Sequence, residues 1–258
     1  AAGCGGGDEA APPPSTSASA PVALRCDDSL KTEFRPDAQT TVLLVKAFAA
    51  GEPLALAGTT GTPPVAAADL CLVKLQVGPG SPGTAGAPST SSGIGIEIWL
   101  PTAARWNERI RNLGGGGWAG GNHLSTTLIA STPAAALAGA GYVSGTTDTG
   151  HSGPGGGAFA MREDGGINTK FWQDFSQRSL VELALKTRQL VAAYYLKPQR
   201  YAYWQGCSTG GRQGYKIAQE RPELYDGFLN EAPVVNFNAL SLFTLYPQVV
   251  VRRDLVDN

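Results

Sequence analysis

The segment Gly206-Cys207-Ser208-Thr209-Gly210 places a serine between two glycines, a pattern typical of a catalytic nucleophile. Residues 201–205 before it have the character of a buried strand, and residues 210–220 after it have the character of a helix. The glycines permit a strained strand-to-helix turn, which exposes the serine hydroxyl at the edge of a sheet. Amides of the helix's first turn, including that of Thr209, can then stabilise a developing oxyanion. The pattern predicts that Ser208 is a nucleophile; the alternative is an incidental turn in a glycine-rich chain.

A second glycine cluster, Gly114 to Gly117, is followed by Trp118 and comes directly after a short predicted strand at residues 109–113. In α/β-hydrolases the loop in this position contributes the other oxyanion amide, and glycines let the backbone approach the substrate carbonyl. The alternative is a flexible loop, because 34 of the 258 residues are glycine. If residues 71–77, 94–100, 109–113, 142–147 and 201–205 are strands, Ser208 follows the fifth, as expected for an α/β-hydrolase nucleophile.

A serine nucleophile needs a neighbouring base, and the candidates for that base are few. The chain has two histidines, His123 and His151, and both precede Ser208, whereas the hydrolase order is Ser, then Asp or Glu, then His. Neither histidine fits by order. We expect His151 to brace a loop near the site and His123 to line a loop or the rim of a pocket. Asp254 and Asp257 are expected to be surface charges rather than the acid of a triad.

The arrangement of elements predicts the fold class. Helical patterns at residues 133–140, 175–196 and 210–220 alternate with the strands, and a further strand is predicted at residues 227–232. Asp174 or Ser176 is the expected cap of the longest helix. This alternation predicts an α/β protein with a mostly parallel sheet and helices on both faces. Residues 22–258 form the predicted catalytic domain, residues 1–21 a flexible tether, and residues 78–92 a long surface loop.

Composition excludes some partners. The 20 basic and 21 acidic residues give a net charge of −1, and no basic block recurs that could follow a phosphate backbone, so nucleic acid is not an expected partner. No run of about 18 apolar residues exists that could span a membrane. Cys4, after Ala1-Ala2-Gly3, resembles the acylated cysteine at the end of a bacterial lipoprotein signal. The alternative is a cleaved export signal with an ordinary flexible start, and both alternatives place the protein in the periplasm or outside the cell.

Several segments together resemble one family. The run from Gly206 to Arg212, with Cys207 directly before the serine, is similar to the tannase and feruloyl esterase family, which includes mono(2-hydroxyethyl) terephthalate hydrolases. Further matches are Trp106-Asn107, the segment from Asp148 to His151, and the stretch from Arg221 to Pro233. The resemblance covers about residues 26–233.

The resemblance implies roles for individual residues. Ser208 would be the nucleophile, and the amides of Thr209 and Gly115, or a glycine one position from it, would form the oxyanion hole. Cys207 would form one half of a disulfide to a later His-Cys pair. Cys26 and Cys71 would form the family's amino-terminal disulfide, which suits an exported protein; the alternative is two buried free thiols.

The chain also departs from the family pattern. The 50 residues after Ser208 contain no histidine and no cysteine. We therefore expect the chain to be the amino-terminal part of a longer enzyme. The last strands, the triad Asp, the His-Cys pair, and the lid with its structural calcium would lie further along. No metal or other cofactor is expected in these 258 residues.

The expected function is that of an exported serine carboxylesterase. It would hydrolyse a small aromatic ester of the gallate, ferulate or terephthalate type through an acyl-enzyme on Ser208. The alternative is a catalytically silent scaffold that needs the missing carboxyl-terminal segment as its partner. A third hypothesis is that the protein is a lipid-anchored binding module with the same fold.

Overall fold

The computed structural model describes residues 22–81, 90–152 and 156–256. The predicted tether at residues 1–21 with Cys4, the middle of the predicted loop at residues 78–92, and Asp257 lie outside these ranges. A disulfide joins Cys26 to Cys71, with the two Cα atoms 5.8 Å apart, so the expected pairing is confirmed.

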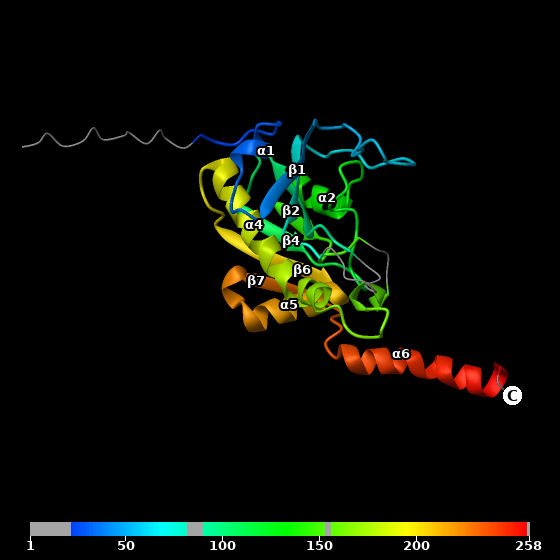
Figure 1. Ribbon diagram of the computed structural model, residues 1–258. Helices are drawn as coiled ribbons and strands as arrows, with labels where there is room; N and C mark the ends of the chain where they lie inside the picture. The colour runs from blue at the N-terminus through cyan, green and yellow to red at the C-terminus, as the bar shows by residue number, and fades with distance from the viewer. Residues whose placement is uncertain (1–21, 82–89, 153–155, 257–258) are drawn as a thin grey trace, which may run out of the picture.

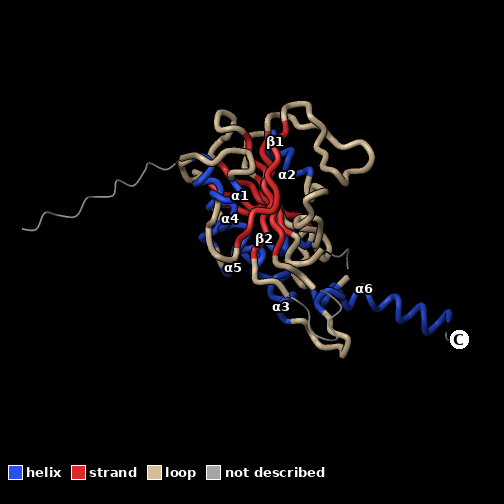
Figure 2. Tube along the Cα trace, turned by 45° about the horizontal axis from the view of Figure 1, so that its top comes forward, coloured by secondary structure: helices blue, strands red, loops and turns tan. Residues whose placement is uncertain are grey.

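In the described ranges, seven strands form two hydrogen-bonded groups that lie side by side as one twisted central sheet, drawn in red in Figure 2. Four pair in an antiparallel manner in the order β1-β2-β3-β5: Thr40–Phe48, Leu70–Val77, Ile94–Pro101 and Ser144–Thr147. Three pair in parallel in the order β4-β6-β7: Arg109–Leu113, Tyr201–Cys207 and Gly227–Glu231. The Val143 N–H donates to the Arg109 carbonyl at 3.0 Å, which joins the two groups side by side. The parallel pairing predicted from the alternation is found in the half that carries the candidate site.

The two faces of the sheet pack against different helices. Ile94, Ile96, Ile98 and Leu100 of β3 face the larger core, which includes side chains of α4 (Ser179–Tyr195) and α5 (Thr209–Glu220). Trp99 faces the smaller core under α2 (Thr132–Gly139). The predicted strand is therefore present, its side chains alternate between the two cores, and both of its faces are buried.

The remaining helical segments are short, apart from α6. They are α1 (Leu30–Glu33), the 3-10 turns η1 (Gly157–Ala160) and η3 (Pro222–Leu224), α3 (Thr169–Gln173), the π-helical segments η2 (Asp174–Arg178) and η4 (Arg252–Val256), and α6 (Phe237–Val251). Helix α6 extends away from the body of the protein and buries none of its residues (Figure 1). Across the three described ranges, no helix is both long enough and apolar enough to cross a membrane.

Two sequence-based expectations about elements need correction. The sequence did not reveal β1, where a register shift between Val42 and Leu44 interrupts the alternation. This edge strand makes Ser208 follow the sixth strand along the chain rather than the fifth. The long helix was predicted to begin at a cap, Asp174 or Ser176, but helical turns already start at Thr169. Asp174 is buried there and accepts hydrogen bonds from Lys170 and Arg178, so it lies inside the helical stretch.

Candidate active site

Ser208 lies at a sharp turn between β6 and α5. Its backbone has φ 58° and ψ −117°, a region that non-glycine residues rarely adopt. The Ser208 N–H donates to the Glu231 carbonyl at 3.0 Å, and the Ser208 carbonyl accepts from the Arg212 N–H at 3.1 Å. A Cβ on Gly206 would lie 2.6 Å from the Gly210 Cα, so the turn requires glycine at this position. The strand-turn-helix geometry predicted from the sequence is present.

The glycine loop after β4 packs against this turn. The Gly114 N–H donates to the Gln205 carbonyl at 2.8 Å, which continues the β4–β6 pairing. The Thr209 hydroxyl donates to the Gly117 carbonyl at 2.6 Å. A Cβ on Gly114 would lie 2.6 Å from the Gly210 Cα, so the two backbones are in close contact. The fold therefore brings together the two glycine segments that the sequence pattern selected.

The amide of Gly115 has a partner within the protein. Its N–H donates to the side-chain oxygen of Gln213 at 3.0 Å, so in this structure it does not offer a free donor to a substrate. The next residue, Gly116, has no atom within 4 Å of the position that a Cβ would occupy. Gly116, one position from Gly115, is the alternative that the resemblance leaves open for the second oxyanion amide. The oxyanion roles of Thr209 and of this loop stay predictions.

A cavity of about 360 Å³ lies at the carboxyl ends of β4, β6 and β7, beside the turn. Its walls include Gly114, Gly115, Gly116, His123, Ser131, Thr146, Cys207 and Glu231. Cys207 is an exposed free thiol, so the disulfide expected with a later cysteine stays a prediction.

His123 lines this cavity, as expected, but is an unsuitable base. Its Nε2 lies 3.0 Å from the Thr146 hydroxyl, and its Nδ1 is buried and has no hydrogen-bond partner among the residues that the structure describes. Burial, assisted by the charge of Lys74, lowers the pKa of His123 to about 3. The ring is therefore neutral near pH 7, and its hydrogen bond joins it to β5.

His151 braces a loop. Its ring stacks on Phe159 with centroids 3.7 Å apart, and Phe159 also packs against Trp118, which follows the glycine loop. Its Nδ1 lies 3.4 Å from the Thr149 hydroxyl, and burial lowers the pKa of His151. Within the three described ranges, neither histidine forms a hydrogen bond with Ser208.

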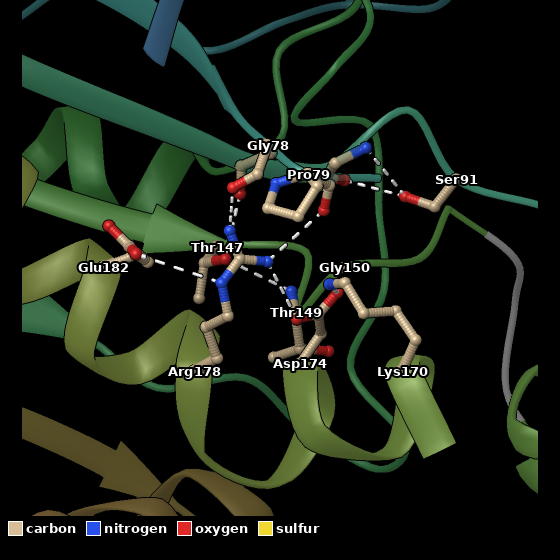
Figure 3. Close-up of polar contacts among 12 residues, drawn as sticks. Gly78, Pro79, Ser91, Thr147, Thr149, Gly150, Lys170, Asp174, Arg178 and Glu182 are labelled. Carbon is tan, nitrogen blue, oxygen red and sulfur yellow. Dashed lines mark hydrogen bonds and ion pairs between the residues drawn. The ribbon is translucent and has the colours of Figure 1, made fainter. Parts of the chain in front are cut away.

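The loop that carries His151 is held by buried carboxylates. Asp148 is fully buried and accepts hydrogen bonds from the Gly95 N–H at 2.9 Å and the Gly150 N–H at 2.7 Å. Burial raises the pKa of Asp148 to about 8. Figure 3 shows Asp174 below Gly150, with the Arg178 guanidinium extending from Asp174 to the Gly78 carbonyl. The sequence pattern marked residues 148–151 only by family resemblance and did not reveal that Asp148 is buried.

A buried ion pair supports the cavity from the other side. Lys74 Nζ lies 3.0 Å from Glu97 Oε2, and both side chains are completely buried on adjacent strands. Lys74 also donates to the Asn122 carbonyl at 2.9 Å, while Glu97 accepts from the Ser131 N–H at 3.0 Å. The pair therefore holds the loop from residue 122 to 131, which forms a wall of the cavity. The sequence analysis did not predict this pair, whose signal in the sequence is one charged residue within each of two apolar strands.

Asp254 behaves as expected for a surface charge. It is exposed in η4 and forms an ion pair with Arg253. In the described ranges, no group of three or more His, Cys, Asp or Glu side chains could hold a metal ion.

The order β1-β2-β3-β5-β4-β6-β7, the helices on both faces and the strained serine turn after β6 define an α/β-hydrolase. Residues 82–255 match the family model described as tannase and feruloyl esterase. The chain belongs to this family.

Relatives agree with this assignment. A probable feruloyl esterase from Arthroderma benhamiae is 37% identical over 163 residues, which cover 62% of this chain and 29% of that protein. A probable feruloyl esterase B from Aspergillus niger is 30% identical over 225 residues, covering 84% of this chain and 39% of the relative. The crystal structure of feruloyl esterase B from Aspergillus oryzae superimposes with a TM-score of 0.66 at 27% identity, covering 84% of this chain and 39% of that one. The chain thus spans less than two fifths of the length of these relatives.

Proposed function

We propose that the protein is a serine carboxylesterase that hydrolyses esters of aromatic acids through an acyl-enzyme on Ser208. The observation that carries this proposal is the strained backbone of Ser208 at a strand-to-helix turn beside a glycine-lined cavity. Strain of this kind is stored at functional sites, where it presents a side chain in one orientation. Because the relatives are named as probable feruloyl esterases, a feruloyl ester is the first candidate substrate, with gallate and terephthalate esters as alternatives.

In the proposed reaction, Ser208 Oγ attacks the ester carbonyl carbon and loses its proton to a base. The oxyanion that forms accepts hydrogen bonds from the amides of Thr209 and of Gly116 or Gly115. The alcohol leaves with the proton, and water then releases the acid from the serine by the same steps.

The base is proposed to come from outside residues 1–258. His123 and His151 are buried in other contacts and precede the serine in the chain, as described above. The chain alone would then be nearly silent, with activity about four to six orders of magnitude below that of the complete enzyme. Export of the protein, acylation of Cys4 and a structural calcium in a lid beyond residue 258 are further proposals. The disulfide between Cys26 and Cys71 supports export.

The test compares the full native gene product with residues 1–258 on methyl ferulate, propyl gallate and mono(2-hydroxyethyl) terephthalate. We expect turnover by the full protein, its loss in Ser208→Ala, and mass addition on the Ser208 peptide with a fluorophosphonate probe. Ser176→Ala, outside the turn, is the matched control and keeps activity. Turnover by the Ser208→Ala variant would contradict the assignment. Ser208-dependent turnover by residues 1–258 alone would show that the base lies within this chain.

A further inference from the structure

The guanidinium of Arg212 is partly buried, and two of its nitrogens have no hydrogen-bond partner in the described ranges. It lies one turn after Ser208 in α5, and its guanidinium carbon is 5.3 Å from the ring centroid of Phe175 and 5.1 Å from that of Phe237. Its Nε and Nη2 atoms are buried, and neither has a hydrogen-bond partner in the described ranges. A guanidinium stays charged at any physiological pH, so these donors cannot avoid the cost of burial by losing a proton.

The surroundings of Arg212 contain cations and aromatic rings but no carboxylate that pairs with it. The nearby Lys216 forms an ion pair with Glu220, and Glu220 also accepts a hydrogen bond from Gln177. In the part of the chain that the structure describes, no Asp or Glu forms an ion pair with Arg212. Within these ranges the positive charge of Arg212 therefore has no ion-pair partner.

A cleft lies beside this side chain. Its volume is about 670 Å³, and it is bounded by Arg212, Tyr215, Lys216, Gln219, Asn236 and Phe237. None of its lining residues belongs to the cavity beside the glycine loop, so the two sites are separate. The cleft combines an unpaired cation, amide groups and two aromatic side chains.

We propose that this cleft is a carboxylate-binding site, in which Arg212 holds one carboxylate through Nε and Nη2. These two nitrogens lie on the same edge of the planar guanidinium and point their N–H groups in parallel, which matches the two oxygens of a carboxylate. The rings of Phe175 and Phe237 keep the guanidinium plane in place. The carboxylate belongs either to an Asp or Glu side chain of the longer protein or to a free aromatic acid.

The proposal is tested on the 258-residue chain carrying Ser208→Ala, so that it does not depend on Ser208 being the nucleophile. The Arg212 Nε–H resonance is followed by NMR during titration with sodium benzoate and, separately, with benzamide, which has a similar shape but no charge. We expect a saturable shift with benzoate and none with benzamide. Binding should weaken at least tenfold in Arg212→Gln, followed there on neighbouring backbone amides, and stay within twofold in Lys197→Gln, which removes an exposed cation outside the cleft.

Titration with acetate separates the two sources of the carboxylate. Equal affinity for acetate and benzoate indicates a protein side chain as the natural partner, whereas at least tenfold tighter binding of benzoate indicates a free aromatic acid; both results support the site. If Arg212→Gln does not fold, Arg212→Lys keeps the charge without the two parallel donors and should also weaken binding. Absence of saturation with benzoate, equal binding of benzamide, or undiminished binding in the folded Arg212 variants would overturn the proposal.

Discussion

The side-chain oxygen of Gln213 accepts the backbone N–H of Gly115 at 3.0 Å, although 98 residues separate the two along the chain. This contact fastens the glycine loop to the first turns of α5, next to Ser208. It also occupies an amide that family resemblance assigns to the oxyanion hole. Gln213 therefore helps to hold the loop in position relative to the serine, together with the hydroxyl of Thr209, which donates to the Gly117 carbonyl.

Replacing Gln213 by methionine should loosen this loop. The Gly115 N–H would lose its acceptor at a partly buried position, which costs about 1–3 kcal/mol of unfolding free energy. Thermal or urea unfolding of residues 1–258 measures the loss. Gln219→Met, at an exposed position of the same helix, is the matched control and should change stability by less than about 0.5 kcal/mol. Equal effects of the two variants would show that the Gln213 contact contributes nothing.

Gly206→Ala should prevent the strained turn from forming. The new Cβ would meet the backbone of Gly210, which cannot move because its carbonyl accepts from Trp204 Nε1 at 2.9 Å. We expect a loss of more than about 3 kcal/mol or failure to fold, measured by soluble yield and urea unfolding. Gly116→Ala, where a Cβ meets no atom within 4 Å, should unfold almost as the native chain does. A Gly206→Ala variant of native stability would show that the turn tolerates a side chain.

Lys74→Met should be strongly destabilising, because it leaves the Glu97 carboxylate buried without its cation. Breaking a buried ion pair in this way costs about 3–5 kcal/mol. Lys46→Met removes the exposed pair with Glu52 and should cost at most about 1 kcal/mol. Urea unfolding of both variants gives the comparison. If Lys74→Met costs no more than Lys46→Met, Glu97 is adequately held by the N–H groups that it accepts from Trp99, Ala130 and Ser131.

The stability of the fold should fall as the pH rises from about 6.5 to 8. The pKa of Asp148 is about 8 in the fold and 3.8 ordinarily, so the folded state binds the extra proton between these values and stability declines with pH. Below about pH 6.5 this decline is offset by His123. The pKa of His123 is about 3 in the fold, so between pH 3 and 6.5 this histidine binds a proton in the unfolded chain but not in the folded one. Above pH 6.5 the offset from His123 ends, and the Asp148 effect is on the order of 2 kcal/mol between pH 6.5 and 8.

Asp148→Asn tests this pH dependence, because asparagine has no proton to lose and its oxygen can still accept from the Gly95 and Gly150 amides. Unfolding free energies at pH 6.5, 7.2 and 8 should then be level. Asp37→Asn is the control, since pairing with Lys186 lowers the pKa of Asp37 and confines its titration to acid pH. A fall of the native size in the Asp148→Asn variant would assign the pH dependence to another group.

The serine turn and the glycine loop were predictable because their constraints are local. The turn at Ser208 requires glycine on both sides, and both glycines lie within five consecutive residues of the sequence. The strand alternation of residues 94–100 is equally local, as is the proline-led helix at residues 133–140. The strand at Thr40–Phe48 was not predicted from such local patterns, because the bulge that interrupts its alternation depends on how it pairs with the neighbouring strand β2.

The fold class, the turn that presents Ser208, the glycine loop near it and, through family resemblance, the Cys26–Cys71 disulfide could all be predicted from the amino-acid sequence. Which charges are buried, and which partners they find, became known from the three-dimensional structure. The pairing of Lys74 with Glu97 depends on strand register. The hydrogen bond from the Gly115 amide to Gln213 depends on how a loop packs on a helix. The surroundings of Arg212 depend on two aromatic rings, Phe175 and Phe237, that come from distant segments. The physical reason is that burial and pairing are properties of contacts between distant residues, which no local spacing specifies.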